Sequence, residues 1–213
     1  NLVFISIWID LYLLLNLLYN KLTEKPLLFI MYLITLSIIF TTLLLTANIT
    51  AVKIIAIGSE GIDAGIIAYP LTFLLSDVLS EVYGRKTTTK IIWIGFFANL
   101  IMITMLFIAG QLPSANFWNE QDAYNKILGS VPRIVLASMI AYLVSQNHDV
   151  IAFEIWKKFT KGKFLWLRNN ASTIVSQGID TFLFVSIAFT GVYSIDEMWN
   201  MIWITYLIKV AIA

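Results

Sequence analysis

The sequence contains no cysteine and a single histidine, and charged residues make up only 13% of its 213 residues. The absence of cysteine excludes disulfide bonds and thiolate metal sites, and a single histidine disfavours a histidine-based metal site. The sequence also lacks the short motifs of an ATPase phosphate loop, a zinc protease and a serine hydrolase. We therefore expect no metal, no cofactor, no ATP hydrolysis and no enzymatic activity.

Hydrophobic residues account for 59% of the chain, and the mean hydropathy is +0.83. Because an ordinary soluble domain is nearer to half apolar, this composition predicts an integral membrane protein in contact with the lipid bilayer. The net charge of +1 comes from basic residues spread over short loops, so it does not indicate a nucleic-acid partner.

Seven apolar runs are long enough to be membrane spans, which predicts an all-α, polytopic helical bundle. The runs are Asn1–Tyr19, Leu27–Ile55, Ile66–Tyr83, Ile91–Ala109, Val131–Trp156, Leu167–Ala188 and Met198–Ala213. A glycine-rich break, GSEGIDAG, separates the second run from the third. The chain starts without methionine and stops inside an apolar run, so we expect both ends to be cut from a longer protein.

The loop charges predict an orientation for these spans. Ten basic residues fall on one side if the spans alternate, including the cluster at residues 157–168, and three fall on the other side. Basic loops stay in the cytoplasm, so the side with ten is expected to be cytoplasmic. The third run must cross the membrane for both basic clusters, at residues 85–90 and 157–168, to share that side.

The run from Leu165 to Gly191 is long enough to span a bilayer, yet polar residues recur in it at helical spacing. Asn169 and Asp180 fall on one side of a helix, with Gln177 beside Asp180 one turn earlier and Arg168 near the start. A carboxylate at bilayer depth costs about 3 kcal/mol on insertion scales, so it usually faces a polar cavity or a partner. This polar stripe predicts a binding site.

The third run contains two carboxylates, Asp77 and Glu81, four residues apart on one helix face. Two like charges so close in lipid would repel, so either a cation lies between them or one carboxyl group holds a proton. Alternatively, Glu81 lies at the cytoplasmic interface and pairs with Arg85, and Asp77 caps a neighbouring broken helix.

The pattern S-Q-x-x-D occurs twice, at residues 145–149 and 176–180. In each copy the glutamine and the aspartate share a helix face; the pairs are Gln146 with Asp149 and Gln177 with Asp180. If the two spans are antiparallel, the copies can frame one site near the middle of the membrane. An amide next to a carboxylate suits a flat heterocycle with N–H and C=O groups along one edge, such as a guanine-like base. The alternative is hydrogen bonding between helices.

Two further residues are candidates for a site with weaker signals. Asn48 lies near the end of the second run, and Tyr69, together with Phe73, can stack on a planar ligand. His148 lies on a different helix face from Gln146, which favours a role in helix packing.

Several long stretches carry a family resemblance: NITAVKI, AYPLTFLLSDVLSEVYGRK, YLVSQNHDV and LWLRNNASTIVSQGIDTFLFVSIAF. In order and spacing they resemble the queuosine precursor transporter family, earlier described as vitamin uptake transporters. The resemblance implies a six-span protein of the cell inner membrane with a fold similar to the substrate-binding subunits of energy-coupling-factor importers. Residues 1–25 then form an extra N-terminal transmembrane helix with its basic loop. Residues 26–213 form the six-span transporter domain, with a truncated C-terminal helix.

The resemblance implies import of 7-cyano-7-deazaguanine or 7-aminomethyl-7-deazaguanine for salvage into tRNA queuosine. The base edge would be held by Gln177 and Asp180 on one side and by the other glutamine and aspartate pair on the opposite side. The candidate substrate-binding residues are Asp180, Gln177, Asp149, Gln146, Asp77, Glu81, Asn169, Arg168, Asn48 and Tyr69. A carboxylate such as Asp77 or Glu81 would neutralise the cationic aminomethyl base.

Two other function classes stay open. The chain can be a substrate-capture subunit that works with a separate ATPase motor, for a small heterocycle or vitamin, and it can also form a homo-oligomer. An intramembrane aspartyl protease is the third class, which the glutamines flanking Asp149 and Asp180 disfavour.

Overall fold

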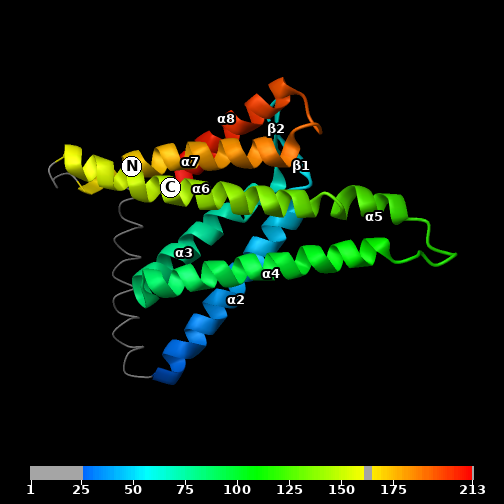
Figure 1. Cartoon of the computed structure of the whole chain (residues 1–213), viewed down its shortest axis with the longest axis horizontal. Coiled ribbons are helices and arrows are strands. Elements are labelled where there is room, and N and C mark those ends of the chain that lie inside the picture. The colour runs from blue at the N-terminus through cyan, green and yellow to red at the C-terminus, as the bar shows by residue number, and fades with distance from the viewer. Residues whose placement is uncertain (1–25, 161–164, 213) are drawn as a thin grey trace. The chain divides into compact units, whose positions relative to one another are not determined.

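The computed structural model describes residues 26–160 and 165–212 (Figure 1). In chain order the elements are α2 (Pro26–Thr50), β1 (Ile54–Ile57), β2 (Glu60–Asp63), the 3-10 turn η1 (Ala64–Ile67), α3 (Tyr69–Tyr83), α4 (Arg85–Gln111), α5 (Gln121–Leu128), α6 (Val131–Phe159), α7 (Leu165–Phe189) and α8 (Ile195–Ile212). The chain is therefore mostly helical, as its apolar runs predicted. The first predicted span, Asn1–Tyr19, lies outside the described residues.

The second predicted helix ends earlier than expected. Its apolar run continues to about Ile55, but α2 ends at Thr50, and the chain then forms an antiparallel hairpin in which Ile54 pairs with Asp63 and Ile57 with Glu60. Gly58 makes the turn with a φ of 64°, a conformation that side chains with a Cβ rarely adopt. The glycine-rich break is thus an ordered β-hairpin.

Local sequence signals mark several helix ends. Pro26 begins α2, where its missing N–H would have had no partner within the helix. Gly84 separates α3 from α4 with a φ of 80°. Before α8, the Ser194 backbone N–H donates to Glu197 Oε2 at 2.8 Å and the Glu197 N–H donates to Ser194 Oγ at 3.3 Å. This reciprocal capping box satisfies donors that the first turn leaves open.

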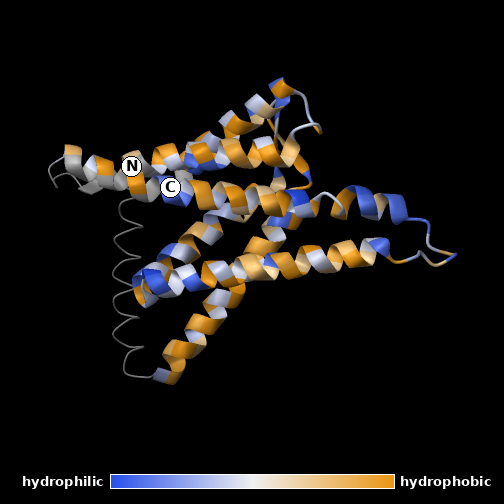
Figure 2. Cartoon of the chain, in the orientation of Figure 1, coloured by the Kyte–Doolittle hydropathy of each residue, from blue (hydrophilic) through white to orange (hydrophobic). Residues whose placement is uncertain are grey.

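Many large apolar side chains of the helices are exposed. Hydrophobic residues recur along the length of α2, α4 and α7 (Figure 2). Within the described residues, three helical stretches are long and apolar enough to cross a membrane: Pro26–Thr50, Arg85–Gln111 and Gln121–His148. Thr173–Phe189 is a shorter apolar helix. A soluble protein would cover these side chains, whereas a bilayer solvates them. The stretch Gln121–His148 begins with the short helix α5, which is itself largely hydrophilic and was not expected from the sequence.

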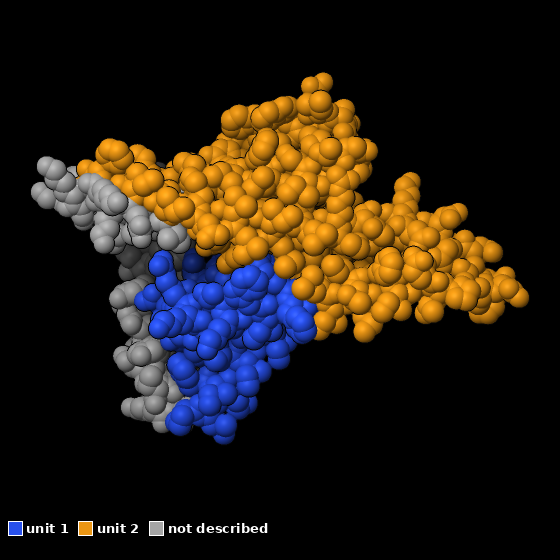
Figure 3. Space-filling model, in the orientation of Figure 1, with its two compact units in different colours: residues 1–45, 71–98 blue, residues 46–70, 99–213 orange. Residues whose placement is uncertain are grey.

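The chain divides into two compact units (Figure 3). Of the described residues, the first contains 26–45 together with Leu71–Ala98, and Phe40, Leu79 and Ile91 form its buried apolar cluster. The second contains Thr46–Pro70 together with Asn99–Ala213. Its core is built from α6, α7 and α8, with Ile134, Val185 and Met201 among its buried side chains. The site described next lies entirely within this second unit.

Candidate functional site

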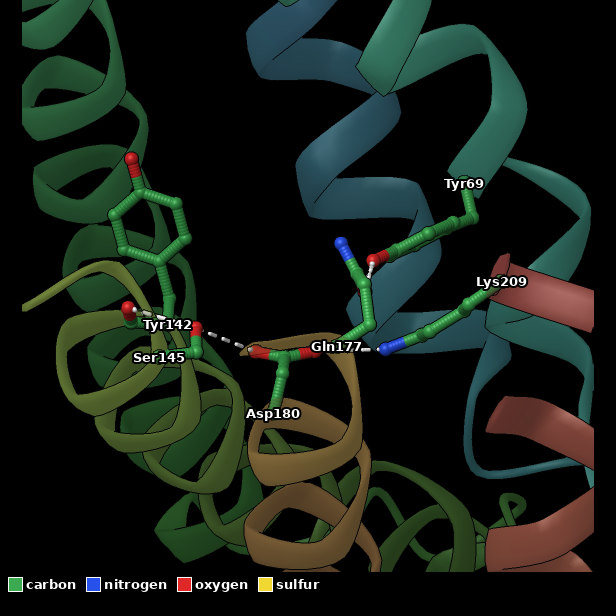
Figure 4. Close-up of polar contacts among 6 residues, drawn as sticks. All are labelled: Tyr69, Tyr142, Ser145, Gln177, Asp180 and Lys209. Carbon is green, nitrogen blue, oxygen red and sulfur yellow. Dashed lines mark hydrogen bonds and ion pairs between the residues drawn. The ribbon is translucent and has the colours of Figure 1, made fainter. Parts of the chain in front are cut away.

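An ion pair joins α7 to α8 in the interior of the second unit. Lys209 Nζ lies 2.7 Å from Asp180 Oδ2, and the exposed fractions of the two side chains are 6% and 19% (Figure 4). Both residues belong to helices of the apolar bundle, so each charge needs the other as a counter-ion. The carboxylate that the polar stripe singled out is thus neutralised by a lysine from the last helix.

Tyr69, the first residue of α3, completes the group around Lys209. The Lys209 ammonium lies 4.4 Å from the centroid of the Tyr69 ring, a distance at which a cation is attracted to an aromatic face. The Tyr69 hydroxyl donates a hydrogen bond of 2.6 Å to Gln177 Oε1. Gln177 and Asp180 are three residues apart on α7, so both face the same side. Tyr69, Gln177, Asp180 and Lys209 form one connected cluster, which we call the α7–α8 cluster.

Two polar groups of this cluster make a long hydrogen bond or none with the described part of the protein. Among the described residues, Asp180 Oδ1 accepts only a long contact of 3.4 Å, from Ser145 Oγ. The Ser145 hydroxyl lies closer to the Tyr142 carbonyl oxygen, at 3.1 Å. The Gln177 side-chain oxygen accepts from Tyr69, and the amide nitrogen has no hydrogen-bond partner among the described residues. The α7 face therefore presents a hydrogen-bond donor one helical turn from an acceptor (Figure 4).

Asp63, at the end of β2, is a second buried carboxyl group near Lys209. It is 5% exposed, and burial raises its pKa, although attraction to Lys209 opposes this rise. Gly65 makes room for it, because a Cβ at this position would lie 2.9 Å from Asp63 Oδ1 and 2.7 Å from the Ala47 carbonyl oxygen. The hairpin is tied to α8 at its other end, where Asn200 Nδ2 donates to Glu60 Oε2 at 2.8 Å.

The repeated S-Q-x-x-D motifs lie on α6 and α7, which pack side by side. Ser145 contacts Asp180, and His148 Nδ1 lies 3.1 Å from Ser176 Oγ, so the two motifs meet in antiparallel register. The structure therefore brings the serines of the motifs into the helix interface. Gln146 is exposed, so it does not join Gln177 in the α7–α8 cluster.

The other predicted site residues lie elsewhere. Asn48 Nδ2 donates to Asn99 Oδ1 at 2.8 Å, in a buried amide pair between α2 and α4 within the second unit. Asp77 and Glu81 belong to the first unit, where both side chains are exposed. The side chains of three further candidates lie outside the described part of the structure: Asp149, Arg168 and Asn169.

The comparison with known families decides what kind of protein carries this cluster. Residues 63–213 match the family described as "Putative vitamin uptake transporter", which covers α3 to α8 and therefore the whole α7–α8 cluster. The chain belongs to this family.

Relatives within the family carry a more specific name. A "Probable queuosine precursor transporter" of Bacillus subtilis (strain 168) is 36% identical over 169 residues, which cover 78% of this chain and 73% of the relative. A protein of the same name from Haemophilus influenzae is 31% identical over 128 residues, 59% of this chain and 51% of the relative. No solved structure matches the chain. As a queuosine precursor transporter family member, the protein is a multi-pass membrane transporter and not an enzyme.

Sequence reasoning missed two residues of the site, Lys209 and Asp63. Lys209 stands in an otherwise apolar run, Met198–Ala213, so the rule that drew attention to Asp180 applies to it equally. Asp63 was not considered as a site residue because its segment was interpreted as a glycine-rich break between two spans. Nothing local in the sequence indicates that Lys209 pairs with Asp180, because that contact depends on how α7 and α8 pack.

Proposed function

We propose that this protein imports queuosine precursors, 7-cyano-7-deazaguanine or 7-aminomethyl-7-deazaguanine, and binds them at the α7–α8 cluster. The observation that carries the proposal is the pair of weakly engaged groups on α7, the Gln177 amide N–H and Asp180 Oδ1. The names of the relatives support the same class of substrate. Import into the cytoplasm across the inner membrane, with the basic loops on the cytoplasmic side, is part of the proposal.

The hydrogen-bonding edge of a deazaguanine complements the two α7 groups. The edge carries a carbonyl oxygen next to a ring N–H and an exocyclic amine. The Gln177 amide can donate to the carbonyl, and Asp180 Oδ1 can accept the ring N–H, while Oδ2 stays with Lys209. Hydrogen bonds to a charged acceptor in a site shielded from water are stronger than neutral ones, which favours this edge over an apolar ligand. The Tyr69 ring lies beside the same groups as an aromatic wall.

The experiment that tests the proposal uses a host that cannot synthesise the precursors and expresses the full-length protein. The host is fed low concentrations of each base, and the queuosine content of its tRNA is measured. Gln177→Glu keeps the side-chain shape but replaces the N–H donor by an acceptor, so it should reduce uptake about tenfold to a hundredfold, the equivalent of about 1–3 kcal/mol. Gln146→Glu, the same change at an exposed position on α6, is the matched control and should leave uptake unchanged.

The outcomes separate the alternatives. Wild-type uptake by Gln177→Glu would remove the α7 face from the site, and a loss with Gln146→Glu would extend the site to α6, as the repeated motif predicts. If the purified protein binds the base but no queuosine appears in the tRNA, the result favours a capture subunit that needs a separate ATPase motor. Absence of both binding and uptake would refute the proposed substrate.

A further inference from the structure

The charge balance of the α7–α8 cluster bears on which base it accepts. Lys209 is the buried cation among the described side chains, with an exposed fraction of 5%, and its ammonium forms the 2.7 Å contact with Asp180 Oδ2. Both charges are shielded from water, so neither is screened by solvent. The net charge of the ion pair formed by Lys209 and Asp180 is therefore zero.

Asp63 is a second acidic group near Lys209. It is buried at the end of β2, and burial raises its pKa, which favours the protonated, neutral form. Attraction to Lys209 and hydrogen bonds from backbone N–H groups, including those of Gly65 and Ile66, work in the other direction. The carboxylate in direct contact with Lys209 is that of Asp180, so the charge balance at the contact is set by this pair.

We propose that Lys209 makes this transporter selective for an uncharged base, so that the neutral 7-cyano base binds in preference to the cationic 7-aminomethyl base. This inference rests on the proposed function. A cationic ligand needs an unpaired carboxylate in a buried site, and here Lys209 already occupies the carboxylate of Asp180. The ammonium of Lys209 would also repel a second cation bound nearby. The neutral base meets neither difficulty and still finds both hydrogen-bonding groups.

Removal of Lys209 should reverse the preference. In Lys209→Met, the Asp180 carboxyl group loses the ammonium beside Oδ2, so a cationic ligand can take that place as its counter-ion. The charge-conserving change Lys209→Arg should keep the wild-type preference. Lys53→Met, which removes an exposed lysine of the second unit, changes the net charge of the protein equally and should have no effect on the preference.

The experiment measures the affinity of purified, full-length protein for each of the two bases by competition. We expect the wild type to bind the neutral base at least about tenfold more tightly than the cationic one. We expect Lys209→Met to lower this ratio by about tenfold or more, whereas Lys209→Arg and Lys53→Met retain it. Because the result is a ratio on the same sample, it does not depend on how much of each variant folds.

Each result is decisive. A wild type that binds the cationic base as tightly as the neutral one overturns the inference without any variant, while the proposed function stands. A ratio that Lys209→Met leaves unchanged also overturns it. If the wild type binds neither base, the proposed function fails and this inference fails with it.

Discussion

Breaking the ion pair between Lys209 and Asp180 should destabilise the protein more than any surface charge change. At the observed separation of 2.7 Å, Coulomb's law with an effective dielectric constant of about 20 gives an attraction of about 6 kcal/mol. Part of this attraction offsets the cost of removing two ions from water, so the pair itself contributes little net stability. The effect of Lys209→Met is larger, because it leaves Asp180 buried without a counter-ion. We expect a loss of about 3–5 kcal/mol.

The assay is thermal unfolding of the full-length protein in detergent, followed for each single variant and for the double variant. For a chain of this size, a loss of about 3–5 kcal/mol lowers the melting temperature by about 6–20 °C. Asp180→Asn should be similarly harmful, because it leaves the ammonium of Lys209 unpaired. The double variant Lys209→Met with Asp180→Asn removes both charges and should be more stable than the sum of the single effects predicts. Lys53→Met, at an exposed position, should stay within about 0.5 kcal/mol of the wild type.

Strict additivity of the two single effects would refute the reasoning. It would mean that Lys209 and Asp180 do not interact in the folded protein. A melting temperature that Lys209→Met leaves unchanged would refute it as well, since no buried carboxylate could then depend on this lysine.

Three further predictions follow from buried polar contacts in the second unit. Gly65→Ala places a Cβ 2.7 Å from the Ala47 carbonyl oxygen, so it should cost about 1–3 kcal/mol, measured as a lower melting temperature. Asn99→Leu deprives the buried Asn48 amide of its partner and should lower the free energy of unfolding by about 1–3 kcal/mol. Asn48→Leu should cost less in the Asn99→Leu protein than in the wild type, because the amide pair is already broken. Burial raises the pKa of Asp63, so the stability that this group contributes is complete below its ordinary pKa of 3.8 and is lost as the pH rises through the raised pKa. Melting curves should therefore show the wild type losing stability relative to Asp63→Asn as the pH is raised above 3.8.

The apolar runs predicted the helices because a membrane span needs a long, continuous hydrophobic segment, and such segments are visible in one dimension. The hairpin was not predicted, because its strands are too short to give such a signal. Residues 54–57 are four apolar residues that only three residues separate from α2, and periodicity alone cannot distinguish so short a strand from another helical turn. The turn at Gly58 was the local signal, and it was interpreted only as an interruption. Helix α5 was missed because it is short and polar and lies between two spans.

The candidate site residues on α7 could be predicted from the sequence, but their partners on other helices could not. Gln177 and Asp180 share a face because of helical periodicity, so the sequence predicted that they would act together. Their partners come from α3 and α8, and which face of one helix meets another depends on packing over the whole bundle. The same limit explains the second motif: its spacing matches that of the first, yet Ser145 contacts Asp180 while Gln146 is exposed.

The proposed binding site gives the ion pair a role that holding α7 to α8 does not require. Two well-packed apolar side chains would join the helices without the several kcal/mol that each buried ion loses in leaving water. A site for a polar base has a different requirement, because Asp180 must keep an acceptor available and still be stable when the site is empty. Lys209 meets this requirement because it engages Oδ2, so that Oδ1 accepts only the 3.4 Å contact from Ser145 among the side chains that the structure describes. A base that then fills this acceptor should raise the melting temperature of the wild type and fail to raise that of Asp180→Asn, whereas equal shifts in both would show that the base binds elsewhere.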